Sequence, residues 1–115
     1  MAVLRGEVKA IEQAHAVLGL TYREIAAALR ADESTVHRWR SGDSDPSPVF
    51  LSRLEALEEL LRETEQTFRS EAAARGWLDR DVEALEAKRP RELLLEGRIE
   101  RVTAVLLSLN VGTSI

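Results

Sequence analysis

The sequence of 115 residues contains no cysteine, which excludes a disulfide framework and any metal site built on thiolates. This absence fits a reducing compartment, and we expect a cytoplasmic protein. No apolar run approaches the roughly 20 residues of a membrane-spanning helix. The opening MAVLRGEVKA lacks the apolar stretch of a secretory signal. We therefore expect neither a membrane segment nor a leader.

Strand signals and excess positive charge are also missing. Aromatic residues make up only 4%, and no segment alternates apolar and polar residues over any length. Ala, Leu, Glu and Arg dominate and favour helices, so the sequence predicts an all-α fold. The formal net charge is -4, and any contact with nucleic acid must therefore be local.

The apolar pattern divides the chain into three units. Residues 1–47 are expected to form an N-terminal helix-turn-helix bundle, 48–75 a long linking helix, and 76–115 a small C-terminal helical domain. The stretch GDSDPSP separates the first two units because it holds two prolines and no helix former. Gly76 is expected to end the linking helix, and Pro90 to begin a short later one.

Within the linking helix, apolar positions alternate steps of four and three, as in a coiled-coil seam. A core inside one chain would explain this stripe, and so would a seam between two copies; the sequence leaves both open. The stripe consists of Phe50, Leu54, Leu57, Leu61, Thr64 and Phe68.

Two short helices joined by a few residues predict a helix-turn-helix over 21–42. Thr21 and Glu24 suit a capping box at the start of the first helix, and Asp32 suits the cap of the second. Val36 and Trp39 would face the core. The opposite face of the second helix is polar and partly basic, which suits a DNA major groove.

The stretch TYREIAAALRADESTVHRWRSG resembles the helix-turn-helix of the Xre (phage Cro/repressor) family. Two positions depart from it. Tyr22 stands where the family often has a DNA-bonding glutamine, and Arg30 stands where a turn glycine is usual, so a positive φ there would be strained. The polar face and the resemblance together predict the DNA-binding residues Thr21, Arg23, Ser34, Thr35, His37, Arg38 and Arg40.

Charge limits what this unit can do alone. Residues 1–47 hold six basic and seven acidic side chains. Phosphate contacts supply most non-specific affinity for DNA, so a single copy is expected to bind weakly. A dimer or a larger assembly would compensate. The alternative is a three-helix unit that only packs or binds protein.

The last part of the chain, 77–115, holds a second series of landmarks. A WL pair is followed by Leu85, then KRPRELL, Gly97 and a final apolar helix. Their order resembles the toxin-binding domain of the Xre/MbcA/ParS antitoxins. The departure lies between the WL pair and Leu85, where the family often has proline or glycine. This chain has the helix-forming DRDVEA there, which predicts a short helix over 81–87.

The partners of that family are RES-domain toxins, which degrade NAD. The resemblance implies an antitoxin of a type II toxin–antitoxin system that occludes the toxin's NAD cleft and regulates its own operon through operator DNA. It would act as a homodimer or as a hetero-oligomer with the toxin, without a cofactor. The implied toxin-binding residues are Leu106, Leu109, Asn110, Val111, Gly112, Thr113, Ser114 and Ile115.

Other functions find less support. Glu12 and His15 have the spacing of a di-iron ligand pair, but no second such pair exists, so no metal site is expected. Paired carboxylates such as Glu58 and Glu59 lie among leucines at helical spacing and indicate a solvated face, so we expect no enzyme. Two alternatives remain: a stand-alone repressor whose C-terminal half only dimerises, and a toxin-binding adaptor whose DNA site has decayed.

Overall fold

The computed structural model describes the backbone of residues 5–113 and, outside positions 5, 7 and 110–113, their side chains. Within this range the chain forms α-helices and no β-strand, which confirms the all-α prediction. None of the helices within residues 5–113 is long and apolar enough to cross a membrane. The elements are α1 (Arg5–Leu18), α2 (Tyr22–Leu29), α3 (Glu33–Ser41), α4 (Pro48–Thr67), α5 (Glu71–Leu78), the 3-10 turn η2 (Glu83–Leu85), α6 (Pro90–Leu95) and α7 (Ile99–Thr113).

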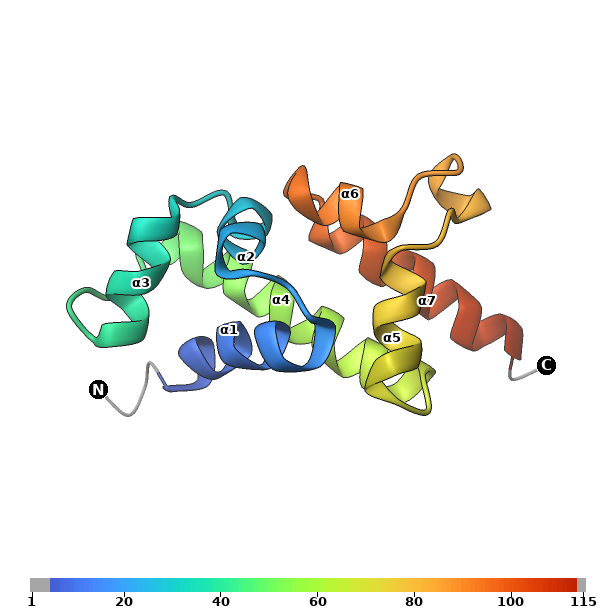
Figure 1. The fold of residues 1–115 in the computed structure, drawn as a ribbon, viewed down its shortest axis with the longest axis horizontal. Coiled ribbons are helices and arrows are strands. Elements are labelled where there is room, and N and C mark those ends of the chain that lie inside the picture. Colours follow the sequence, from blue (N-terminus) through green and yellow to red (C-terminus); the bar gives the residue numbers. More distant parts are fainter. Residues whose placement is uncertain (1–4, 114–115) are drawn as a thin grey trace.

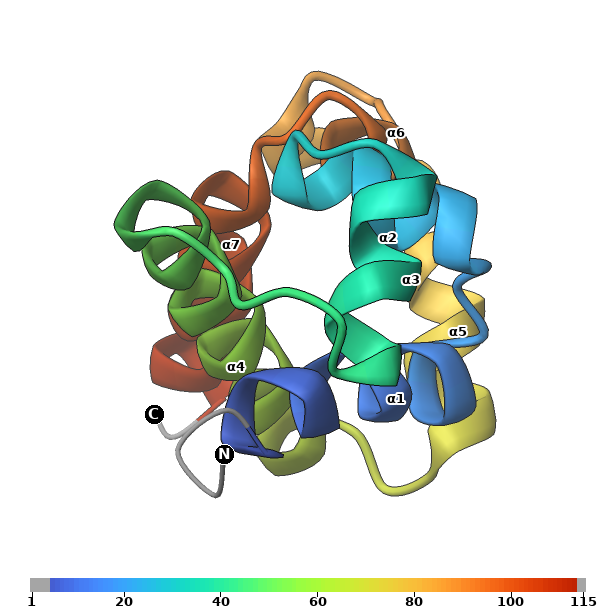
Figure 2. The same ribbon diagram turned by 90° about the vertical axis from the view of Figure 1, so that its left-hand side faces the viewer.

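Helix α4 is the spine of the molecule (Figure 1). It packs against α1 on one side and α7 on the other, and α2 contacts α6. The view down the long axis shows α4 and α7 together on one side and α1 to α3 across from them (Figure 2). The molecule measures 46 × 24 × 24 Å, with α3 near one end and the C-terminal end of α7 near the other (Figure 1).

The start of α2 follows the predicted capping box. The Thr21 hydroxyl accepts a hydrogen bond from the Glu24 amide at 3.0 Å, and the Glu24 carboxylate accepts one from the Thr21 amide at 2.9 Å. Two of the helix's free amides are thereby satisfied. Asp32 occupies the predicted N-cap position of α3, but its side chain makes no capping hydrogen bond, so that detail of the prediction is wrong.

Helix α2 ends at Arg30 in the left-handed region, with φ of 59°. This is the strained conformation expected where the Xre family usually has glycine. A left-handed non-glycine residue costs about 1–2 kcal/mol. The Arg30 guanidinium meanwhile donates a hydrogen bond to the Gly97 carbonyl at 3.3 Å, between α6 and α7. The strained turn is thus tied to the C-terminal half.

The long helix is shorter than predicted. It ends at Thr67, and a new helix, α5, begins at Glu71 after a turn in which the Ser70 hydroxyl accepts a bond from the Ala73 amide at 3.1 Å. Gly76 lies inside α5 and ends no helix, so its predicted role as a breaker is wrong. The N-cap serine and the extended conformation of Phe68 separate the two helices instead.

The apolar stripe of α4 lies in the core of a single chain. Leu54, Leu57, Leu61 and Thr64 are buried, and Leu60 joins them. The core is continuous and draws side chains from both halves of the chain. The two phenylalanines at the ends of the stripe are partly buried and meet the tryptophans: Phe50 lies 5.1 Å from Trp39, and Phe68 lies 5.7 Å from Trp77, between ring centroids.

The segment before α6 is a turn and not the helix expected over 81–87. Only η2 is helical there, and an isolated antiparallel bridge pairs Val82 with Lys88. Glu86 and Ala87 both have positive φ, 60° and 63°, which reverses the chain and ends the turn. Helix α6 begins at Pro90 as predicted.

Candidate functional site

The exposed face of α3 is the face predicted for DNA. Val36 and Trp39 are buried in the core. Ser34, His37 and Arg38 are exposed on the other side, and Figure 2 looks onto the end of the molecule that carries α3. Thr35 is partly exposed, and its hydroxyl accepts a hydrogen bond from Arg38 at 3.0 Å. The face is polar and reachable, as a groove-reading helix requires.

The two predicted phosphate contacts on α2 lie beside this face. Thr21 is exposed, although its hydroxyl is engaged in the capping box. The Arg23 side chain is 87% exposed, and its Nε lies 3.9 Å from a Glu33 oxygen. Glu33 brings an acidic group to the start of α3 and opposes phosphate there.

Arg40 is held by the protein itself. Its Nε donates to Glu12 at 2.6 Å, and its guanidinium carbon lies 3.8 Å from the centroid of the Tyr22 ring. The Tyr22 hydroxyl donates to the other Glu12 oxygen at 2.7 Å, and the His15 ring stacks on Tyr22 at 4.3 Å. The departure at Tyr22 is therefore a packing feature that joins α1, α2 and α3. Periodicity alone could not reveal this contact.

The charges of this cluster shift one another's ionisation. The hydrogen bond from Arg40 holds the pKa of Glu12 below its usual range. The hydrogen bond to Glu12 raises the pKa of Tyr22. Both shifts favour an ionised Glu12 carboxylate and a protonated Tyr22 hydroxyl. In these states the carboxylate accepts hydrogen bonds from both Arg40 and Tyr22.

This lowered pKa predicts how an acid titration will behave. A carboxylate with a depressed folded-state pKa stabilises the fold above its unfolded pKa, and that contribution is lost as pH falls through the folded-state value. We expect Glu12→Gln to be less stable than the wild type at neutral pH, and the difference to vanish below the folded-state pKa. Urea unfolding between about pH 7 and pH 3 measures it. Parallel curves at every pH would contradict the assignment.

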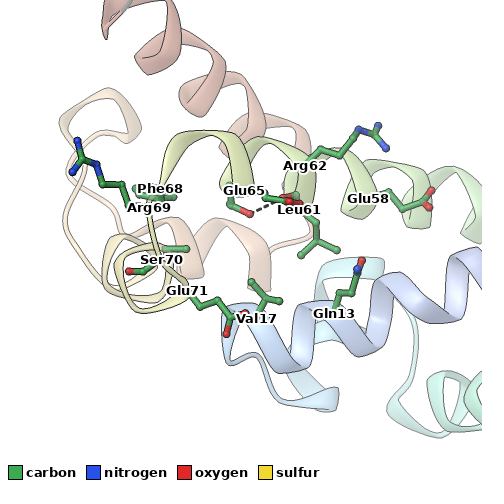
Figure 3. A pocket seen from close by; sticks show the side chains of 12 residues that line it. Gln13, Val17, Glu58, Leu61, Arg62, Glu65, Phe68, Arg69, Ser70 and Glu71 are labelled. Carbon is green, nitrogen blue, oxygen red and sulfur yellow. Dashed lines mark hydrogen bonds between the residues drawn. The ribbon is translucent and has the colours of Figure 1, made fainter.

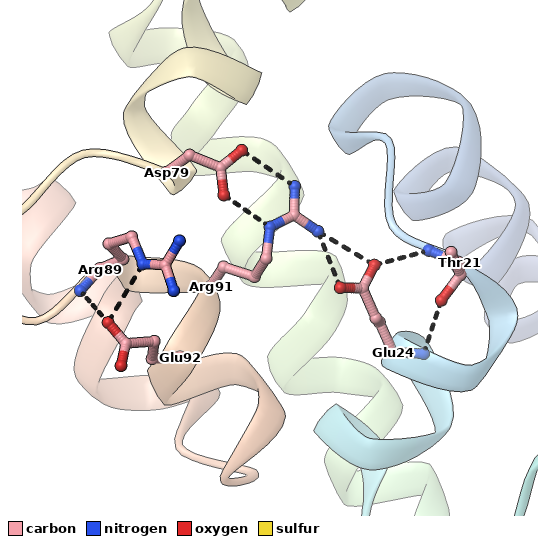
Figure 4. Close-up of polar contacts among 6 residues, drawn as sticks. All are labelled: Thr21, Glu24, Asp79, Arg89, Arg91 and Glu92. Carbon is pink, nitrogen blue, oxygen red and sulfur yellow. Dashed lines mark hydrogen bonds and ion pairs between the residues drawn. The ribbon is translucent and has the colours of Figure 1, made fainter.

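A second charged cluster joins α2 to the C-terminal half (Figure 4). Arg91, at the start of α6, donates to both Glu24 oxygens at 3.0 Å and to Asp79 at 2.8 Å. The hydrogen bond from Arg91 lowers the pKa of Asp79. Beside it, the Arg89 amide donates to Glu92 at 3.0 Å and lowers the pKa of that carboxyl. Glu24, the carboxylate of the α2 capping box, thus also accepts hydrogen bonds from the C-terminal half through Arg91.

Arg53 makes a third tie, from the middle of the molecule. Its side chain is 14% exposed and donates to the Ala28 carbonyl at 2.8 Å, to the Gly97 carbonyl, and to Glu100 at 3.4 Å. Its Nε is buried without a partner. The Gly97 carbonyl therefore accepts from both Arg30 and Arg53.

The end of α7 carries the residues predicted to meet a toxin. Leu106 is fully buried in the core of this chain, whereas Leu109 is 42% exposed. Leu107, which the sequence did not single out, is exposed to a similar degree. The side chains of Asn110, Val111, Gly112 and Thr113, and the whole of Ser114 and Ile115, lie outside the described residues.

An open groove of about 560 Å³ lies where α4 gives way to α5 (Figure 3). Its lining includes the apolar side chains of Val17, Leu61 and Phe68 together with charged side chains of both signs. It exists because the chain turns before Ser70 instead of continuing the helix. The sequence did not predict it, since the break was expected several residues later.

Comparison with protein families identifies both halves of this structure. Residues 7–44 match the homeodomain-like domain, and residues 56–112 match the "Antitoxin Xre/MbcA/ParS C-terminal toxin-binding domain". The two matches fall on the helix-turn-helix and on the helices from α4 to α7. The chain belongs to the Xre/MbcA/ParS antitoxin family and is an antitoxin of a toxin–antitoxin system.

Individual relatives support this assignment. The mycobacterial cidal antitoxin MbcA of Mycobacterium tuberculosis is 28% identical over 102 residues, which cover 83% of each chain, and the MbcA of Mycobacterium bovis gives the same values. Among solved structures, the crystal structure of the M. tuberculosis MbcT-MbcA toxin-antitoxin complex contains a chain that matches with a TM-score of 0.68 and 26% identity. That match covers 91% of this chain and 94% of the other.

Proposed function

We propose that this antitoxin binds a RES-domain toxin that degrades NAD, and inhibits it by covering its NAD cleft with the C-terminal end of α7 and the residues that follow. The observation that carries the proposal is the match of residues 56–112 to a toxin-binding domain. The similarity to a chain of a solved toxin–antitoxin complex supports it. Occlusion needs no catalytic group on the antitoxin.

The exposed leucines of α7 fit this role. Leu107 and Leu109 are 44% and 42% exposed toward the end of α7, whereas Ile99, Val102, Val105 and Leu106 of the same helix are buried. Burying such surface against a partner is favourable by about 25 cal/mol per Å². Leu106 would act indirectly, because in this structure it holds α7 to the core.

We further propose that residues 1–47 bind operator DNA through α3, that 48–75 connect the two functions, and that 76–115 hold the toxin. The exposed Ser34, His37 and Arg38 support the DNA-binding role. The local charge is close to neutral, so assembly with the toxin would raise occupancy by presenting several copies together.

The test uses the product of the neighbouring gene. We expect that protein to consume NAD, this chain to stop it, and a chain lacking residues 110–115 to inhibit poorly. A neighbour that neither consumes NAD nor binds this chain would remove the RES-toxin proposal and favour the stand-alone repressor.

Point substitutions locate the surface. We expect Leu107→Ala combined with Leu109→Ala to weaken toxin binding by roughly tenfold or more, because two half-exposed leucines would lose about 1.4 kcal/mol or more of apolar burial. Isothermal titration calorimetry measures this change. Val49→Ala is the matched control, since Val49 is 71% exposed at the start of α4 and should leave affinity unchanged. If the leucine double substitution and Val49→Ala change toxin affinity equally, the toxin does not bind at the exposed leucines of α7.

A further inference from the structure

Arg40 contacts a second residue of α3, and that contact bears on what the helix can read. Besides its bond to Glu12, its guanidinium lies 3.2 Å from Nδ1 of His37. A guanidinium can only donate hydrogen bonds. Nδ1 of His37 is therefore the acceptor, and in the neutral ring the proton sits on Nε2. Nε2 lies 3.5 Å from a Glu33 oxygen, a long contact to an acceptor that agrees with this tautomer.

The other histidine shows the opposite arrangement. Nδ1 of His15 lies 2.8 Å from the Leu20 carbonyl, which can only accept, so Nδ1 of that ring carries the proton. Both imidazoles lie next to the Tyr22 ring: His15 is stacked on it at 4.3 Å and His37 is tilted against it at 5.7 Å, between ring centroids. One protein thus holds its two histidines in different tautomers, each chosen by its partner.

We propose that Arg40 is a positioning residue that holds His37 as an Nε2–H donor, and that His37 with this proton selects a hydrogen-bond acceptor on a base edge in the major groove. The acceptors available there are N7 of a purine, O6 of guanine and O4 of thymine; the N4 amino group of cytosine is a donor and is disfavoured. Arg40 itself makes no DNA contact. The inference rests on the DNA-binding part of the proposed function.

The surroundings of Arg40 support a role in positioning His37 and not in contacting DNA. Its side chain is 28% exposed, and its guanidinium is occupied by Glu12, the Tyr22 face and His37. Leaving Glu12 to reach phosphate would break this 2.6 Å ion pair and leave the carboxylate with the Tyr22 hydroxyl as its remaining donor. Nε2 of His37, by contrast, can exchange its long contact with Glu33 for a base at little cost. His37 is exposed on the groove-facing side of α3.

Lysine at position 40 is not expected to hold His37 as arginine does. The guanidinium is planar and can lie flat on a tyrosine ring while directing separate N–H groups to two acceptors, whereas an ammonium is a compact charge on a flexible stem. Arg40→Lys therefore keeps the positive charge but removes the planar group with its directed N–H donors. Arg40→Gln removes both the charge and that planar group. A phosphate contact would survive the first change in large part.

The first experiment reads the tautomer in the free protein. Two-bond ¹H–¹⁵N spectra of the ¹⁵N-labelled chain, at a pH where both rings are neutral, show which nitrogen of each ring is protonated. We expect His37 to be entirely Nε2–H in the wild type and to gain an Nδ1–H population in Arg40→Gln and Arg40→Lys. His15 is the internal reference and should stay Nδ1–H. If the tautomer of His37 is the same in the wild type and in both Arg40 variants, the proposed positioning role of Arg40 is wrong.

The second experiment reads DNA binding with a labelled duplex that spans the DNA directly upstream of the coding sequence. Between about 50 and 200 mM salt, Arg38→Gln should reduce the slope of log affinity against log salt by about 1 if Arg38 meets phosphate. Arg40→Gln and Arg40→Lys should instead weaken binding roughly tenfold with the slope unchanged, as for one lost base contact.

The outcomes separate the inference from the function it rests on. A reduced slope in Arg40→Gln, or affinity restored by Arg40→Lys, would show that Arg40 contacts phosphate and would overturn the inference. A wild-type chain that does not retain the duplex removes the DNA-binding proposal and with it the base-reading role of His37. In that case the tautomer spectra still decide whether Arg40 positions His37.

Discussion

Replacing Gly97 by alanine should lower the free energy of unfolding by about 3 kcal/mol. Gly97 has φ of +77°, where an alanine costs about 1–2 kcal/mol. A Cβ there would also lie 2.4 Å from Nε and 2.9 Å from Cγ of Arg30. The Arg30 side chain would have to leave, and the Gly97 carbonyl would lose a donor that ties the helix-turn-helix to α7. Urea unfolding measures the change, and the melting temperature should fall by roughly 10 °C.

Gly76 supplies the matched control with the opposite sign. It lies inside α5, and a Cβ built there meets nothing within 4 Å. Alanine is about 0.5–1 kcal/mol more favourable than glycine in a helix interior, so Gly76→Ala should stabilise the protein by about that amount. If both glycine substitutions destabilise equally, the account of these two positions is wrong.

Replacing Arg53 by methionine should cost about 2–3 kcal/mol. Methionine keeps much of the aliphatic stem but removes the donors to the Ala28 and Gly97 carbonyls. An acceptor left unsatisfied in a buried position costs about 1–3 kcal/mol. The loss is moderated because the buried Nε of Arg53, which has no partner, disappears as well. Because the tie joins α2, α4 and the α6–α7 turn, hydrogen exchange should also rise at the start of α7.

Arg62 tests whether the loss of Arg53 is only a loss of charge. It lies on the same helix with its side chain 61% exposed and pairs with Glu59 one turn away. Exposed pairs of this kind contribute little to stability. Arg62→Met should therefore change the free energy of unfolding by less than about 0.5 kcal/mol. Similar losses for the two arginines would indicate a general effect of charge and not the specific tie.

The parts of the fold that sequence reasoning predicted depend on neighbouring residues. The capping box of Thr21 and Glu24, the buried Val36 and Trp39, and the left-handed Arg30 all follow from patterns within a few positions. Such patterns act through local backbone chemistry and helical periodicity, so they can be recognised without a structure.

The missed features have a different origin. The end of α4 was misplaced because Gly76 is a stronger breaker signal than the serine cap at Ser70, although the cap begins the new helix. The ties of Arg40 to Glu12 and of Arg53 to Gly97 span 28 and 44 positions of the sequence. Neither spacing nor composition can specify which of many arginines meets which distant acceptor. The DNA contact predicted at Arg40 and the toxin contact predicted at Leu106 are untested, and both side chains are already engaged within the chain. For Arg40 we propose the positioning role instead.

The length of the molecule limits which operators it could read. Helix α3 and the end of α7 lie at opposite ends of a body 46 Å long. Two copies joined directly end to end through their C-terminal ends would place their α3 helices close to twice that distance apart. Since the major groove returns to the same face of DNA about every 34 Å, such a pair would span roughly two to three helical turns. Its half-sites would then flank a long central stretch that neither copy touches.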